Sequence, residues 1–269
     1  MSAGNSKGRH SLPFSVDSYG SEETNHHKLC KNEGFLALFE KQKWRTIRKR
    51  LKSKIANRLV QSKGTYRISS LGLALGHNAP IDIVILIMDL DASIALQKDG
   101  LGASPLHIAC LNGAPFETTR ILIERYPHLV ADRDADFRTP LHHAVECMCQ
   151  LERGNVRTHE NVLKIIGALV DVAPQTVHYT DKHGDSPLDL THIVMMENDT
   201  SSFSSDESIY NRVESLYRYL KKVSIKVYLQ QKEKWEIAGF DLKRTIMESS
   251  NKSNGSQEDT EDSTVTSHE

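Results

Sequence analysis

The chain has 269 residues, and its 34 Lys and Arg nearly balance its 35 Asp and Glu, giving a formal net charge of −1 at pH 7. A nearly neutral chain has no general attraction to nucleic acid or to anionic membranes, so any such binding needs a local patch. The longest apolar run, residues 83–88, is far too short to cross a bilayer. We expect a soluble protein of one or two domains with no transmembrane segment.

The cysteines and the first residues indicate an intracellular protein. The chain has four cysteines, Cys30, Cys110, Cys147 and Cys149, and their spacing does not form a disulfide framework, which favours a reducing compartment. Residues 1–20 contain no apolar stretch of the length that a signal peptide needs. We expect the protein in the cytoplasm, the nucleus or both.

Composition divides the chain into three parts. Residues 1–33 are polar and show no apolar period, so we expect them to be disordered. Residues 34–235 carry the helical apolar pattern, and within them residues 35–62 predict one or two helices that cap the N-terminal end. Residues 236–269 form an acidic C-terminal segment that we expect to be mostly disordered.

The central part repeats itself with a period of about 35 residues. The hexapeptide Ser-Pro-Leu-His-Ile-Ala at residues 104–109 returns as Thr-Pro-Leu-His-His-Ala at 139–144. A weaker copy lies at 69–74, and a fourth begins at Ser186. Such a period predicts stacked helix pairs that bury their apolar faces on one another. Ser or Thr before Pro predicts the start of the first helix of each pair.

Two further segments belong to this array. The third repeat is 12 residues longer than the others, with the extra residues placed between about 149 and 160, where the helices lengthen or a loop bulges out. After a polar stretch at 200–207, apolar residues at helical spacing predict an amphipathic helix that covers the last repeat. These residues are Ile209, Val213, Leu216, Leu220, Val223 and Val227.

Residues 99–109, Asp-Gly-Leu-Gly-Ala-Ser-Pro-Leu-His-Ile-Ala, resemble the ankyrin-repeat signature D-x-x-G-x-T-P-L-H-x-A, and residues 181–188 are similar to its first part. The resemblance implies an all-α, ankyrin-type helix-turn-helix solenoid of about four repeats with helical caps and disordered termini. The glycine of the finger turn is kept at Gly102 and Gly184 but replaced by Arg67 and Phe137. Because a positive φ would strain Phe137, we expect its finger to have another shape.

The family resemblance also implies a binding face. In ankyrin-repeat proteins the finger turns and first helices line a concave face that binds other proteins. The positions of this chain that match are Tyr66, Ile68, Leu101, Ala103, Asp136, Phe137, Arg138, Lys182, His183 and Asp185 in the fingers, and Leu111, Asn112 and Glu146 in the first helices. We expect Tyr66, Leu101 and Phe137 to be apolar anchors and Arg138 a hydrogen-bonding one. The alternative is that finger side chains are solvated or pack on the next finger.

These features predict a non-catalytic scaffold or adaptor whose partners are polypeptides. The sequence contains no phosphate-binding loop, zinc-protease motif, nucleophile elbow or dinucleotide fingerprint, so we expect no enzyme and no cofactor. His143 and Cys147 lie one turn apart and could both reach a metal. However, His142 aligns with the repeat motif and buried cysteines are usually inert, so we expect no metal site.

The segment from Lys41 to Arg67 contains eleven Lys or Arg and no Asp or Glu. It could be the face with which a nuclear factor contacts nucleic acid or another anionic partner. It could instead be a solvated helix face whose apolar side packs on the first repeat, which is the usual role of a charge run. The sequence favours the second interpretation, so nucleic acid is not the expected partner. The acidic residues 258–262 are a further candidate to cover this face.

Overall fold

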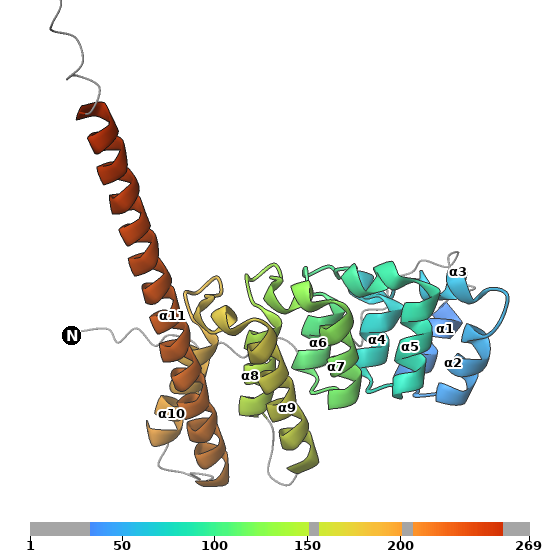
Figure 1. Ribbon diagram of the computed structural model, residues 1–269. Helices are drawn as coiled ribbons and strands as arrows, with labels where there is room; N and C mark the ends of the chain where they lie inside the picture. The colour runs from blue at the N-terminus through green and yellow to red at the C-terminus, as the bar shows by residue number, and fades with distance from the viewer. Residues whose placement is uncertain (1–32, 151–155, 201–206, 255–269) are drawn as a thin grey trace, which may run out of the picture. The chain divides into compact units, whose positions relative to one another are not determined.

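The computed structural model describes residues 33–150, 156–200 and 207–254, and all regular elements in these ranges are helices (Figure 1). The disorder predicted before residue 33 and at the acidic end of the chain lies outside these ranges, as does Cys30. Among the described helices, none is both long and apolar enough to span a membrane.

Three short helices, not one or two, precede the repeats. They are α1 (Glu33–Glu40), α2 (Trp44–Leu51) and α3 (Ala56–Val60). The chain turns between α1 and α2 at Gln42, which has a φ of 50°. Phe35 and Phe39 of α1 are fully buried, with their rings 5.3 Å apart. No Pro or Gly marks either break in the sequence, which is why apolar spacing alone undercounted the helices.

The repeats follow as pairs of helices in two layers (Figure 1). First helices α4 (Ser70–Gly76), α6 (Pro105–Leu111), α8 (Pro140–Gln150) and α10 (Pro187–Thr200) pack in one layer, and second helices α5 (Ile81–Leu90), α7 (Phe116–Arg125) and α9 (Val156–Val172) pack in the other. Leu71, Leu106 and Leu141, which occupy the same position of the repeat, are completely buried. The predicted all-helical repeat fold is therefore confirmed.

The third repeat accommodates its extra residues by lengthening both helices. α8 has 11 residues and α9 has 17, whereas α6 and α7 have 7 and 10. Residues 151–155, between α8 and α9, lie outside the described ranges. Short 3₁₀ helices follow the second helices and lead to the next repeat: η3 (Ala92–Leu96), η4 (Pro127–Ala131) and η5 (Pro174–His178).

The chain divides into two compact units, residues 1–221 and 222–269, and helix α11 (Glu207–Asn254) runs through the boundary. In the first unit, Val213, Leu216 and Leu220 of α11 are buried, as the apolar spacing predicted. The Arg212 guanidinium bonds the His159 ring of α9, so the start of α11 covers the last repeats.

Helix α11 differs from the sequence expectation at its far end. It continues past residue 236, where a mostly disordered segment was expected to begin, and ends at Asn254. Residues 241–254 are mostly Asp, Lys, Arg, Glu, Ser and Asn, with scattered apolar residues that form no apolar stripe. Apolar periodicity therefore could not detect this part of the helix.

Candidate functional site

Four five-residue turns, which we call fingers, project between the helix pairs at residues 64–68, 99–103, 134–138 and 181–185. In each finger the N–H of the first residue donates to the C=O of the fifth, at 2.8–3.0 Å. The N–H of the fourth residue donates to the C=O of the first, at 3.1–3.2 Å. The same two backbone hydrogen bonds therefore close all four fingers, although in the first finger the third residue, Tyr66, also has a positive φ of 54°.

The expectation that Phe137 would give its finger another shape is wrong. Phe137 has a φ of 60° and Arg67 a φ of 62°, close to the 76° of Gly102 and the 88° of Gly184. A left-handed conformation costs a residue with a Cβ about 1–2 kcal/mol. The hydrogen bonds that close each finger offset this cost, so the shape is kept although the glycine is lost.

Aspartate side chains hold three of the fingers from inside. Oδ1 of Asp99 accepts the N–H groups of Leu101 and Ala103 at 2.8 and 2.9 Å. Asp134 and Asp181 bond the third and fifth residues of their own fingers in the same way.

Burial raises the pKa of Asp99. Burial acts in the same direction on Asp134, but its pKa is lowered because the His143 ring bonds its other oxygen at 2.8 Å.

The fingers are joined to one another by a ladder of backbone hydrogen bonds. The N–H of the second residue of one finger donates to the C=O of the third residue of the preceding finger. The three bonds are Gly100 to Tyr66 at 2.6 Å, Ala135 to Leu101 at 2.9 Å and Lys182 to Asp136 at 2.9 Å. This finger ladder fixes the spacing of side chains that come from different repeats.

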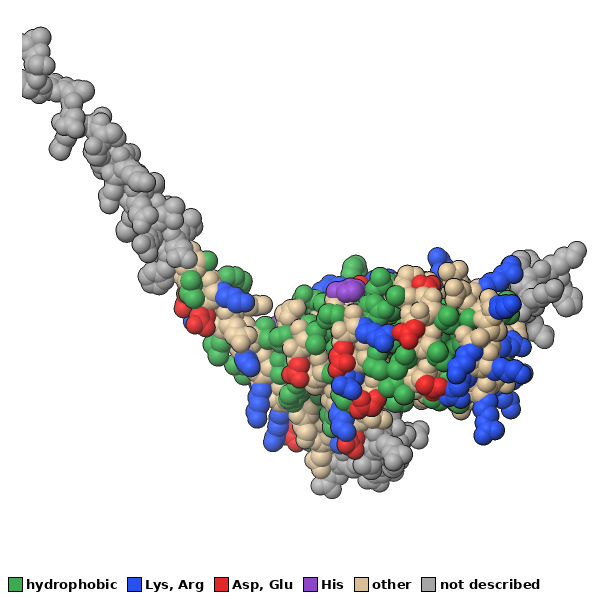
Figure 2. Space-filling view, turned by 45° about the vertical axis from the view of Figure 1, so that its right-hand side comes forward, with side chains coloured by type: hydrophobic (Ala, Val, Ile, Leu, Met, Phe, Trp, Pro, Cys, Tyr) green, Lys and Arg blue, Asp and Glu red, His purple; other side chains and the backbone are tan. Residues whose placement is uncertain are grey.

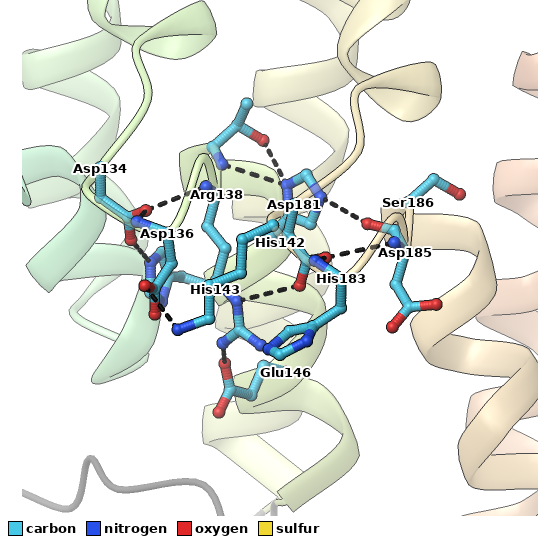
Figure 3. Close-up of polar contacts among 12 residues, drawn as sticks. Asp134, Asp136, Arg138, His142, His143, Glu146, Asp181, His183, Asp185 and Ser186 are labelled. Atoms are coloured by element: carbon cyan, nitrogen blue, oxygen red, sulfur yellow. Dashed lines mark hydrogen bonds and ion pairs between the residues drawn. The ribbon is translucent and has the colours of Figure 1, made fainter.

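Two motif histidines tie the first helices α6 and α8 to the next finger. Nδ1 of His107 accepts the N–H of Ser104 at 3.2 Å, while Nε2 donates to the C=O of Arg138 at 3.1 Å. His142 makes the equivalent bonds to Thr139 at 3.1 Å and to the C=O of Asp185 at 3.3 Å (Figure 3). Burial lowers the pKa of both imidazoles from 6.5 to about 4, so they stay neutral.

Arg138 lies inside the protein and bonds other side chains of the array (Figure 3). Its guanidinium donates to the Glu146 carboxylate at 2.9 Å and to the Asp181 carboxylate at 3.4 Å. Only 13% of the Arg138 side chain is exposed. The residue expected to donate hydrogen bonds to a partner is thus engaged within the array, where it links the third finger to the fourth.

The other predicted contact residues divide by exposure. Tyr66 and Phe137 are 54% exposed and Leu101 is 37% exposed. Lys182 and His183 are also exposed, and the half-buried residues are Ala103, Leu111, Asn112, Asp136 and Asp185. Ile68 is buried and lies beneath the face, not on it. The sequence missed the Lys182–Asp136 ion pair, whose charged atoms lie 2.7 Å apart, because its partners are 46 residues apart.

The cysteine and histidine cluster of α8 shows the geometry of a packed core. Cys110, Cys147 and Cys149 are free thiols, and burial raises the pKa of the latter two to about 12. Such thiols remain protonated near neutral pH and are poor nucleophiles and ligands. Within the described ranges, no three His, Cys, Asp or Glu side chains are grouped to hold a metal ion.

Helix pairs stacked in two layers and joined by a finger ladder define an ankyrin-type repeat array. The family model described as ankyrin repeats (3 copies) matches residues 71–166, so the chain contains ankyrin repeats where the sequence predicted them. The fourth finger, at residues 181–185, lies beyond this match although the same bonds close it. A comparison of the chain with curated proteins finds no match.

Ankyrin repeats are generally protein-interaction modules and are typically non-catalytic. The family match identifies no catalytic domain and no specific partner. The fingers form the candidate interaction surface, and the finger ladder sets its geometry.

Gly102 and Gly184 provide a matched test of the finger ladder. A Cβ at residue 102 would lie 2.9 Å from the Ala135 nitrogen, whereas a Cβ at residue 184 meets nothing within 4 Å. Both Ala variants pay the left-handed strain, about 1 kcal/mol, but only Gly102→Ala also disturbs the bond between Ala135 and Leu101. Urea denaturation should show the larger loss of stability for Gly102→Ala. Equal losses would mean that the ladder is not tightly packed there.

The buried histidines make stability depend on pH. Between pH 6.5 and 4 the unfolded chain binds protons at His107 and His142 that the folded chain does not. The free energy of unfolding should therefore fall as the pH is lowered through this range, by up to about 1.4 kcal/mol per pH unit for each histidine. Urea titrations at pH 7 and pH 5 measure this slope, and His142→Gln should reduce it. A slope that neither His107→Gln nor His142→Gln changes would contradict the assignment.

Proposed function

We propose that the finger face, formed by the fingers and the adjoining ends of the first helices, binds a polypeptide partner and that the protein acts as a scaffold without catalysing a reaction. The face is organised for binding because its exposed apolar groups come from successive fingers. Tyr66, Leu101 and Phe137 lie on three neighbouring fingers that the ladder holds in register. Anchors fixed before binding lose little conformational freedom when a partner docks, which favours affinity.

The backbone conformation and the exposure of Phe137 are the main support for this proposal. Its backbone is in the left-handed region, at a position where two of the four fingers have Gly. Burial of the ring does not compensate the strain, since 54% of the residue is exposed. Strained residues concentrate at functional surfaces, and exposed aromatic side chains are frequent binding hot spots. A strained, exposed Phe on the rim of three aligned fingers fits an anchor that contacts a partner.

The polar groups beside these anchors fit the border of a protein interface. Lys182 and His183 are exposed on the fourth finger, and Asp136 of the third finger is paired with Lys182 at 2.7 Å. Apolar anchors bordered by solvated polar groups are the usual arrangement of such interfaces.

Replacing Phe137 separates its effect on the stability of the fold from its effect on partner binding. Phe137→Gly should raise the free energy of unfolding by about 0.5–1 kcal/mol, because relief of the left-handed strain exceeds the entropy that glycine adds to the unfolded chain. Phe137→Ala keeps the strained backbone and should leave stability nearly unchanged. Chemical denaturation of the three proteins measures both effects. A loss of stability in Phe137→Gly would show that the ring supports the fold.

A binding experiment tests the face itself. Tyr66→Ser, Leu101→Ser and Phe137→Gly are combined in one variant, and Ile81→Ser, Leu163→Ser and Val172→Ser in another. The control residues are exposed apolar side chains of the second-helix layer. Affinity purification followed by titration with the recovered partner should show at least a tenfold loss for the finger variant only. An unchanged partner set and affinity for the finger variant would refute the proposed face.

A further inference from the structure

A second surface lies on α2, apart from the finger face. Figure 2 shows Lys and Arg side chains gathered at the end of the stack where α1 to α3 lie. Arg45, Arg48, Lys49 and Lys52 line a shallow depression there. Their spacing places them on one side of the helix, while Ile47 and Leu51 on the other side are buried. Ile47 and Leu51 pack as the sequence predicted, whereas Ile55 of the same predicted face is 55% exposed. The four cations share the opposite side of α2, where Arg45, Lys49 and Lys52 are exposed.

The charges of this depression are poorly balanced. Among the described residues, Arg48 alone of the four is in an ion pair, with Asp82 of α5 at 2.9 Å. Like charges one turn apart on a helix repel each other, so the four cations do not stabilise α2. The helix dipole favours cations in the last turn, but Arg45 lies in the first turn, where the dipole opposes it. An anionic ligand would remove this repulsion.

We propose that the α2 depression binds the phosphate backbone of a nucleic acid duplex without reading its sequence. All four lining groups are Lys or Arg, whose charge suits phosphate oxygens. Residues 45 and 52 are about 10 Å apart along the helix axis. A duplex carries one charge per about 1.7 Å, so several phosphates lie within reach of the four cations.

The neighbouring residues favour a duplex over the other anionic partners. Single strands bind by stacking their bases on exposed aromatic rings. The aromatic residue of α2, Trp44, is half-buried with its ring 6.3 Å from that of Phe39. A bilayer surface would favour several exposed apolar side chains beside the cations. In α1 to α3 the large exposed apolar residue is Ile55. This inference is independent of the proposed function, because it concerns a different face.

The experiment measures binding of a fluorescent 20-base-pair duplex of arbitrary sequence to the full chain by anisotropy, between 50 and 200 mM NaCl. Three phosphate contacts, made by the cations outside the Arg48–Asp82 pair, predict a slope of log K against log salt of about −2.7. Arg45→Gln, Lys49→Gln and Lys52→Gln, combined in one variant that keeps this pair, should bring the slope close to zero and weaken binding at least tenfold at 50 mM. The control variant Lys222→Gln, Lys226→Gln and Lys234→Gln removes the same charge from α11 and should bind as the unmodified chain does.

Several results would overturn the proposal. One is an unchanged slope in the α2 variant, and another is an equal loss in the control variant. Tighter binding of the single strand than of the duplex would contradict the duplex assignment. Retention on vesicles of anionic lipid through the same residues, without retention on the duplex, would make the surface a membrane contact. Lys49→Glu, a single exposed substitution, repeats the test if circular dichroism shows that the triple variant is unfolded.

Discussion

The array depends on hydrogen bonds that cross from each repeat to its neighbour at the fingers. Backbone groups make the ladder, and the two buried imidazoles add links from α6 and α8 to the next finger. A finger alone would leave these groups exposed to water, where their net contribution is small. In the stack they are satisfied by protein partners while the first helices bury Leu71, Leu106 and Leu141 side by side. The hydrogen bonds between fingers and the burial of the first helices therefore form together as each repeat packs on its neighbour.

This nearest-neighbour bonding explains why the third repeat can differ so much from the others. Its helices are longer and it holds the buried group of Arg138, Glu146 and Asp181, yet the backbone bonds on either side of it are unchanged. Buried ion pairs contribute little net stability but strongly penalise the loss of one partner. The third and fourth repeats are therefore specific to each other, in contrast to the first pair of fingers, which is joined through backbone groups.

The sequence predicted the repeat fold well because short local sequence patterns determine where its helices begin and which residues are buried. Ser or Thr before Pro begins a helix, and a 35-residue period aligns the apolar positions. The sequence prediction failed at Phe137, where two energies compete. The strain of the left-handed backbone is smaller than the stabilisation from the hydrogen bonds that close the finger. The sequence could not show contacts between residues that are distant along the chain: the ion pair of Arg138, an expected partner contact, with Asp181, 43 residues away, is seen only in the structure. Helix spacing predicts that the α2 cations share one side of the helix. The shallow depression that they line cannot be derived from spacing alone.

One substitution in the repeat motif changes the hydrogen bonds that the fourth repeat can offer to a neighbour. Asp189 occupies the position of His107 and His142 in the fourth repeat, and its carboxylate accepts the Ser186 N–H at 2.9 Å, as the imidazole nitrogens do. A carboxylate only accepts, so it has no N–H with which to bond the C=O of a following finger as the imidazoles do, and in the described part of the chain no finger follows. The first repeat has Gly72 at this position and is joined to the next finger through backbone groups. The fourth repeat therefore keeps the cap at the start of its helix but lacks the second link that His107 and His142 provide.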